Sequence, residues 1–185
     1  MWCVDMTNKA LEIGTKLLYR TILTRIIAVN MGDLPDGDLS IPQRQCLCHA
    51  HMHNEPSVGE IAQGLEISNV AAAKLIDRLV KKNLLFREEG KKDRRVIKIK
   101  LTAQGKYWIE HYKARQTQIF EGIIARMPPE AVLDLQNGLM EFFRAAFETP
   151  EQLEKICLRC GLEHIQDCPG NLRYRELTGH DKEKN

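Results

Sequence analysis

Residues 57–101, SVGEIAQGLEISNVAAAKLIDRLVKKNLLFREEGKKDRRVIKIKL, decide the fold. Ser57 and Glu60 have the spacing of a capping box, which predicts that a short helix begins here. Ser68 can cap a second helix, which we expect over about 69–82. Only a few residues join the two helices, as in a helix-turn-helix motif.

The hydrophobic period changes from 3.6 to 2 after this second helix. The segments 84–87 and 96–101 have the character of strands, and the charged residues 88–94 lie between them around Gly90. This pattern predicts a β-hairpin. Helices followed by a hairpin are the layout of a winged helix-turn-helix, in which the second helix of the motif enters the major groove of DNA.

The flanking sequence is helical on both sides. A helix over about 6–30 precedes the Gly- and Pro-rich loop 31–40, and Ser40 can cap a further helix to about residue 53. Two longer helices follow the hairpin, over 103–127 and 130–147. The fold class is therefore mainly α with a small β-hairpin wing, with a helical dimerisation region beside the winged domain.

Four segments are expected along the chain. The outer helices have apolar faces too wide for one small core, which favours a homodimer. The segments are an N-terminal dimerisation helix and loop (1–37), a winged helix-turn-helix domain (38–102), C-terminal dimerisation helices (103–148) and a Cys-rich tail (149–185).

Composition and charge narrow the class of protein. The 185 residues are 43% hydrophobic and 28% charged, as in soluble globular proteins. No apolar run approaches the roughly 20 residues that span a bilayer, and the N-terminus does not resemble a signal peptide. We therefore expect a cytoplasmic protein with no membrane partner. Residues 41–100 carry a net charge of +5 within a chain of +2, so a polyanion should bind there.

The residues expected to contact double-stranded DNA lie in the two motif helices and at the hairpin tip. Short side chains at the start of the second helix can reach base edges, and basic side chains further along can reach phosphates. A basic tip can enter the minor groove, although a solvated charged hairpin is the simpler alternative. The set is Ser57, Ser68, Asn69, Val70, Ala71, Lys74, Arg78, Lys91, Lys92, Arg94 and Arg95.

The segment PSVGEIAQGLEISNVAAAKLIDRLVKKNLLFREEGKKDRRVIKIKLTAQGK resembles the core of the MarR family of transcription regulators. The resemblance is specific at Asp77-Arg78-Leu79, at Asp93-Arg94-Arg95 and at Leu101-Thr102 with Gly105. It implies a homodimer on palindromic DNA, with Arg95 in the minor groove and either Asp77 or Asp93 holding Arg95 in place. It also suggests a pocket for a small-molecule effector between the DNA-binding lobe and the dimer helices.

The tail extends beyond the usual end of that family. Three thiols and one imidazole within 12 residues, at Cys157, Cys160, His164 and Cys168, could fill a tetrahedral zinc site if the chain bends near Gly161. An iron–sulfur cluster is the alternative, and buried cysteines without metal are another. We expect the polar end RYRELTGHDKEKN to be mobile.

A second group of soft ligands lies in QCLCHAHMHNE, at Cys46, Cys48, His49, His51 and His53. Cys46, His49 and His53 share a helix face and could coordinate a metal. The simpler interpretation is that Cys46 belongs to the buried stripe of this helix, with the histidines at its exposed end.

The patterns predict a dimeric transcription regulator that responds to a ligand, a metal or a redox signal. One version is a sensor whose tail cluster controls DNA binding. A metalloenzyme is less favoured, because the sequence has no nucleophile–base pair, phosphate loop or paired carboxylates, and a closed Cys3His site leaves no open position for substrate. An adaptor that does not bind DNA is disfavoured by the basic wing.

Overall fold

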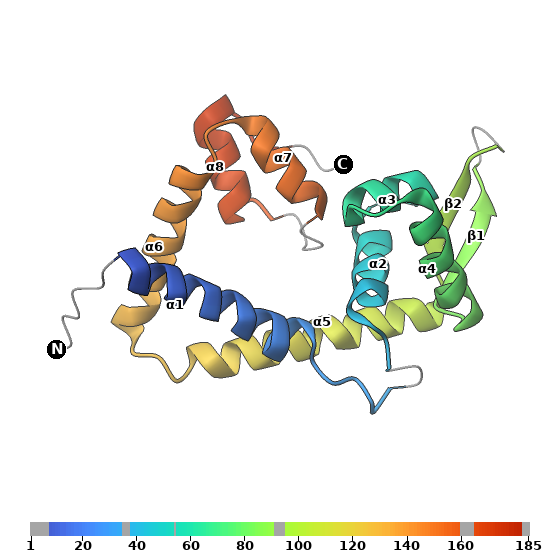
Figure 1. Ribbon diagram of the computed structural model, residues 1–185, viewed down its shortest axis with the longest axis horizontal. Helices are drawn as coiled ribbons and strands as arrows, with labels where there is room; N and C mark the ends of the chain where they lie inside the picture. Colours follow the sequence, from blue (N-terminus) through green and yellow to red (C-terminus); the bar gives the residue numbers. More distant parts are fainter. Residues whose placement is uncertain (1–7, 35–37, 54, 91–94, 160–164, 183–185) are drawn as a thin grey trace.

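The shape of the molecule is set by one long helix with a lobe at one end and a helical arm at the other (Figure 1). The computed structural model describes residues 8–34, 38–53, 55–90, 95–159 and 165–182. Its described part is mostly helical with a two-stranded antiparallel hairpin, which confirms the predicted fold class.

The lobe contains three short helices and the hairpin. The helices are α2 (Ile41–Met52), α3 (Val58–Leu65) and α4 (Asn69–Lys81). The predicted capping box at Ser57 is present, and Ser40, predicted as a cap, also forms a capping box, with Gln43. The strands are β1 (Leu85–Glu89) and β2 (Ile97–Leu101). The lobe therefore has the arrangement that the sequence predicted, with the first strand displaced slightly toward the C-terminus.

A single hydrophobic core holds the lobe together. Its fully buried side chains come from every lobe element and from the start of α5 (Ala103–Ile124). The largest are Trp108, Leu47, Ile61, Ile76, Leu79, Leu84, Leu85, Ile99 and Ile109. Burying one such aliphatic side chain contributes roughly 1.5–3 kcal/mol.

The hairpin is fixed to the lobe at its base. Leu85 pairs with Leu101 and Glu89 with Ile97, so Ile99 points into the core. The amide of Ile99 also donates a 2.8 Å hydrogen bond to the carbonyl of Pro56, just before α3. The wing therefore extends from a rigid base.

The first helical region is less regular than predicted. Instead of one α-helix over 6–30, α1 (Asn8–Thr21) continues into η1 (Ile22–Ile27), a π-helix. Two side chains, from α5 and α2, hold the end of η1 by hydrogen bonds to its backbone and to the loop after it. Tyr112 of α5 donates a 2.8 Å bond to the Ile27 carbonyl, and the buried Arg44 donates to the carbonyls of Ile27 and Val29 at 3.2 and 2.5 Å.

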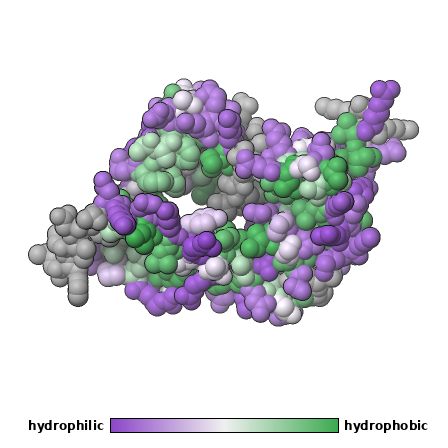
Figure 2. Space-filling model, viewed as in Figure 1, coloured by the Kyte–Doolittle hydropathy of each residue, from purple (hydrophilic) through white to green (hydrophobic). Residues whose placement is uncertain are grey.

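Two helices outside the lobe bury no residue within one chain. These are α1 and α6 (Pro129–Ala146). Their exposed apolar side chains include Leu11, Ile13, Leu17, Leu18, Leu133, Leu139 and Phe142. Figure 2 shows hydrophobic surface over α1 and the adjoining part of α5. Such contiguous apolar surface is typical of an interaction site.

The tail forms a second helical unit rather than a mobile end. It consists of α7 (Pro150–Arg159) and α8 (Pro169–Thr178), which pack against each other. Asn171 is 1% exposed, and its Nδ2 donates 2.9 Å bonds to the Gln166 carbonyl and to Asp181. The expectation of mobility was therefore wrong for residues 173–182, because one buried amide organises this polar segment.

None of the helices within these described ranges has both the length and the apolar character that are needed to cross a bilayer.

Candidate nucleic-acid interface

The start of α4 leaves several short side chains in solvent. The Ser68 hydroxyl caps the helix by accepting a 3.2 Å bond from the Ala71 amide. Asn69, Val70 and Ala71 are exposed, Val70 by 65%. The opposite face of α4 is buried through Ala72, Leu75, Ile76 and Leu79. This end of the helix is therefore held rigidly while its tip remains open to a partner.

Basic side chains continue along the same helix. Lys74 and Arg78 are exposed, one and two turns beyond the tip, and Lys81 lies in the last turn. Their positions suit contacts to phosphates on either side of a groove, which set register without reading sequence.

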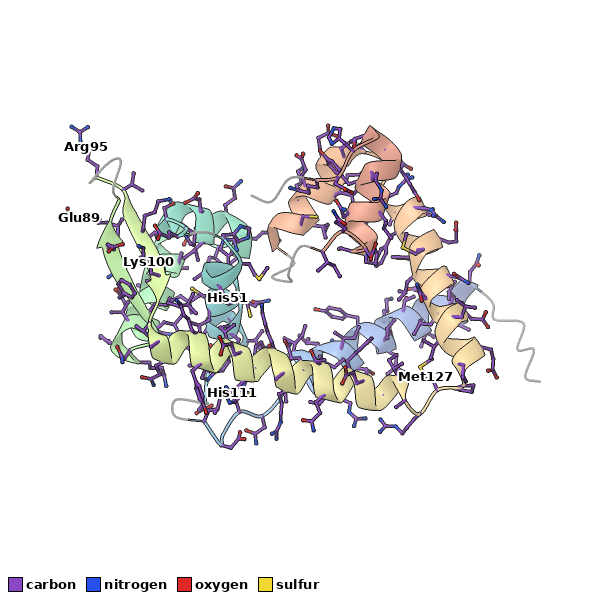
Figure 3. All side chains as sticks on the ribbon, turned by 180° about the vertical axis from the view of Figure 1, so that it is seen from behind. His51, Glu89, Arg95, Lys100, His111 and Met127 are labelled. Carbon is purple, nitrogen blue, oxygen red and sulfur yellow. The ribbon has the colours of Figure 1, made fainter. Side chains whose placement is uncertain are left out.

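The wing carries further positive charge away from the lobe. Figure 3 shows Arg95 at the outer end of the hairpin with its side chain directed away from the body, whereas Lys100 lies near the base. Lys91, Lys92, Asp93 and Arg94, which were also expected to act here, lie outside the described residues.

Asp77, one of the two carboxylates expected to hold Arg95, pairs with a different arginine. Its Oδ1 lies 2.7 Å from Nη1 of Arg87 on β1, and the expected pairing with Arg95 is not made. The physical reason is position: Arg87 lies in the strand beside α4, and Arg95 lies at the far end of the hairpin. Asp77 therefore connects α4 to β1 and not to Arg95.

Two lysines of β2 tie the wing base to the acidic residues around it. Lys98 Nζ lies 3.6 Å from Glu60, and Lys100 Nζ lies 2.7 Å from Glu55 and also pairs with Glu88. These lysines are engaged within the protein, whereas Lys74 and Arg78 on α4 and Arg95 on the hairpin are exposed.

Ser57 is occupied by the helix it caps. Its hydroxyl accepts a 3.2 Å bond from the Glu60 amide, and its own amide donates a 2.6 Å bond to the Glu60 carboxylate. The Ser57 backbone donor lowers the pKa of Glu60. The hydroxyl can still donate its proton to a phosphate, so its predicted DNA contact stays a prediction.

Comparison with known proteins places this geometry in a family. The MarR family model matches residues 39–97. The chain is 33% identical to the HTH-type transcriptional repressor MdtR of Bacillus subtilis over 152 residues, which are 82% of this chain and 95% of that protein. The chain belongs to the MarR family. It is a DNA-binding transcription regulator and not an enzyme.

Two solved structures share the fold. The YusO protein of Bacillus subtilis superposes with a TM-score of 0.60 at 24% identity, over 75% of this chain and 99% of that one. Streptococcus pneumoniae FabT in complex with DNA superposes with a TM-score of 0.62 at 18% identity, over 75% of this chain and 95% of that one.

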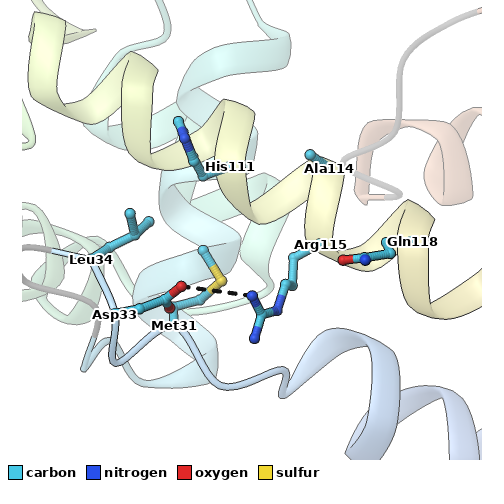
Figure 4. A pocket seen from close by; sticks show the side chains of 7 residues that line it. All are labelled: Met31, Asp33, Leu34, His111, Ala114, Arg115 and Gln118. Atoms are coloured by element: carbon cyan, nitrogen blue, oxygen red, sulfur yellow. Dashed lines mark ion pairs between the residues drawn. The ribbon is translucent and has the colours of Figure 1, made fainter.

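This MarR-family chain also has a cavity of about 340 Å³ between the loop after η1 and the outer side of α5 (Figure 4). Its lining is Met31, Asp33, Leu34, His111, Ala114, Arg115 and Gln118. Arg115 Nη1 lies 3.6 Å from Asp33 Oδ2 across it. Sequence reasoning missed these residues because the loop 31–40 carries only turn signals, and its packing against α5 is a tertiary contact.

The soft ligands of α2 do not come together as a metal site. Among the described residues, which include all five candidates, no group of three or more His, Cys, Asp or Glu is placed to hold a metal ion. Burial raises the pKa of Cys46 to about 12 and that of Cys48 to about 11, so both thiols are protonated near neutral pH. Cys46 is fully buried, as the interpretation of a buried stripe on this helix predicted.

One histidine of α2 is buried rather than exposed. His49 is 4% exposed, and its ring centroid lies 4.1 Å from that of His53. A Cβ on Gly64 would lie 2.2 Å from the His49 ring, so the glycine allows α3 to approach α2 closely. The expectation that the histidines occupy an exposed end was wrong for His49, because α3 covers it.

The four predicted tail ligands are only partly described. Cys157 lies in α7 and Cys168 directly precedes α8, whereas Cys160 and His164 lie outside the described residues. Zinc and an iron–sulfur cluster both stay predictions at this point.

Proposed function

We propose that this regulator binds a palindromic operator as a homodimer. The start of α4 would enter the major groove and present Asn69, Val70 and Ala71 to base edges, with Ser68 beside them. Lys74 and Arg78 would contact phosphates, and the hairpin tip with Arg95 would reach the adjacent minor groove. Lys91, Lys92 and Arg94 would add charge at the same tip.

The exposure of Val70 carries this proposal. An apolar side chain that is 65% exposed contributes little to folding, yet it lies at the tip of a helix whose other face is buried. A methyl group at that place suits contact with the methyl group of thymine. The hydroxyl of Ser68 and the amide of Asn69 flank it, so the tip offers the mixed chemistry that base reading requires.

The helices outside the lobe supply a surface for the second copy. Neither α1 nor α6 buries a residue within one chain, although both carry large apolar side chains. A twofold contact would cover the same patch on each subunit. Phe120, near the end of α5 and 51% exposed, would extend this surface.

The cavity beside α5 is a suitable place for an effector. Met31 and Leu34 offer apolar contacts, and Arg115, His111 and Gln118 offer polar ones. A small molecule with an anionic group could compete with Asp33 for Arg115. Because α5 runs from the lobe toward α6, a ligand here would bias the spacing of the two recognition helices by favouring one arrangement.

Gel-shift titration at several salt concentrations tests the proposal. A fragment selected from genomic DNA should bind more tightly than random competitor, and each phosphate neutralised should contribute about −0.9 to the slope of log affinity against log salt. Asn69→Ala should reduce the preference for the selected fragment, whereas the same change at Asn137, exposed on α6, should not. Equal affinity for both DNAs, or an Asn69→Ala variant with full preference, would contradict the proposal.

A further inference from the structure

Two cysteine sulfurs of the tail border the same small space. A Cβ built on Gly170 would lie 3.9 Å from Sγ of Cys157 and 3.8 Å from Sγ of Cys168. The two thiols come from different helices, because Cys157 lies in α7 and Cys168 is the N-cap residue of α8. Gly170 has no side chain to fill the space between them.

The scaffold around these thiols is ordered by specific contacts. Leu153 of α7 is 1% exposed. The buried Asn171 accepts a 2.9 Å bond from the Lys182 amide, in addition to the two bonds that it donates. The amide of Cys168 donates a 3.1 Å bond to the Ile165 carbonyl, and its carbonyl accepts a 2.9 Å bond from the Leu172 amide, so the backbone of Cys168 is held in place.

A second set of contacts joins the helix pair α7–α8 to the rest of the chain. Arg144 of α6 pairs with Glu176 of α8 at 2.7 Å, and Arg173 Nε donates a 3.0 Å bond to the Phe147 carbonyl. The helix α7 also packs against α3 in the DNA-binding lobe. The two thiols therefore belong to a helix pair that contacts α6 on one side and α3 of the lobe on the other.

We propose that Cys157 and Cys168 are ligands of a zinc ion that joins α7 to α8. Zinc binds cysteine as thiolate, at about 2.3 Å. Two thiols facing one space from two helices are therefore suited to share one ion. Each thiol loses its proton to solvent when the ion binds, and no oxidation state changes. The N-terminus of α8 offsets part of the negative charge that the thiolates bring.

The other two predicted tail ligands are no part of the proposed site. Cys160 follows Cys157 by three residues and lies outside the described part of the chain, as does His164. The proposal rests on the two described thiols. Zinc is favoured over an iron–sulfur cluster by ligand number, because a cluster normally takes four cysteines and the tail contains three.

An ion between Cys157 and Cys168 would stabilise the helix pair α7–α8, of which α7 contacts α3. Through that contact it would influence the DNA-binding lobe, and this consequence rests on the proposed operator binding. The zinc site itself does not, because its occupancy is measured without DNA.

Zinc titration of the full chain in reducing buffer tests the site. The metal-free protein would compete for Zn²⁺ with a chromophoric chelator, and we expect one tightly bound ion per chain. Cys157→Ser and Cys168→Ser should each weaken binding more than about 10-fold, since even outer-shell partners of a metal contribute 10- to 100-fold. Cys48→Ser, a half-buried thiol in α2, is the matched control and should bind as the wild type does.

Cobalt substitution supplies a test that needs no variant. Co²⁺ bound to the wild-type protein should show the near-ultraviolet band of thiolate ligation. The proposal is overturned if reduced wild-type protein binds no zinc or if cobalt shows no thiolate band. It is also overturned if both serine variants bind zinc fully, or if the purified protein contains iron and sulfide instead.

Discussion

Arg87 of β1 and Asp77 of α4 form an ion pair, with Nη1 2.7 Å from Oδ1. The contact joins β1 to the exposed side of α4, two elements that are expected to lie against DNA together in the proposed complex. Both side chains are partly exposed, at 39% and 50%, so the pair contributes little to stability. Its main effect should be to set the direction of the wing relative to α4.

A double-mutant cycle with Asp77→Ala and Arg87→Ala should give a coupling free energy between about 0.2 and 1 kcal/mol. Denaturant unfolding of the four proteins measures it. A coupling well above this range would show that the pair holds the lobe together and does not merely orient the wing.

Arg95→Ala should weaken operator binding by about 10-fold or more, because an arginine in a DNA groove contributes roughly 1–3 kcal/mol. Arg126→Ala makes the same change two residues after α5, beside Met127 at the opposite end of the molecule from Arg95 (Figure 3), and should bind normally. Affinity is measured by gel shift and the oligomeric state by sedimentation. Equal losses in the two variants would mean that general charge, and not the wing tip, governs binding.

Two glycines of α5 should respond in opposite directions to alanine. A Cβ on Gly105 would lie 2.0 Å from the Leu84 carbonyl oxygen, a backbone atom that cannot move aside, whereas a Cβ on Gly122 meets nothing within 4 Å. We expect Gly105→Ala to destabilise the lobe by several kcal/mol, of order 3. Gly122→Ala should be neutral or stabilising by about 0.5–1 kcal/mol. Thermal unfolding of both variants provides the comparison.

Charged residues among the exposed apolar side chains of α1 and α6 should separate the proposed homodimer. Leu17 and Phe142 are 66% and 58% exposed, so Leu17→Glu and Phe142→Asp should leave the lobe folded. Burying the new carboxylates in an interface would be costly. Sedimentation should then show monomers, while Gln136→Glu, an exposed polar site on α6, serves as the control. Dimers that persist in both apolar variants would place the interface elsewhere.

Stability should fall as the pH is lowered toward 5, because of His49. Burial, with His53 nearby, lowers the pKa of His49 from 6.5 to about 4. The unfolded chain therefore takes up a proton below about pH 6.5 that the folded lobe does not accept until about pH 4. Between neutral pH and pH 5 the loss should be about 2 kcal/mol. His49→Gln should reduce this dependence, and His111→Gln, at an exposed site, should preserve it.

The helices and strands of the lobe could be predicted from the sequence, because their ends and hydrophobic periods depend on residues close together in the chain. The capping boxes at Ser40 and Ser57 and the change of period after α4 depend on neighbours a few residues away. The pairing of Asp77 depends instead on how the wing packs. Similarly, the order of the tail depends on one buried amide, Asn171, which polar composition alone does not distinguish from a solvated side chain.

The functional residues that could be predicted are those defined by neighbours in the sequence. The tip of α4 could be located from sequence, because short side chains after a capping serine define a helix start. The cavity beside α5 could not, since Arg115 and Asp33 are far apart in the chain and meet only in three dimensions. The convergence of Cys157 and Cys168 on Gly170 is likewise a consequence of how α7 packs on α8.

Hydroxyl-radical footprinting on a fragment selected from genomic DNA tests the central claim most directly. Two equivalent copies should protect two symmetric half-sites whose centres lie about 10 base pairs apart, one turn of the double helix. Arg95→Ala should remove the minor-groove protection while the half-sites remain. A single unsymmetric footprint, or protection equal to that of random DNA, would contradict the account.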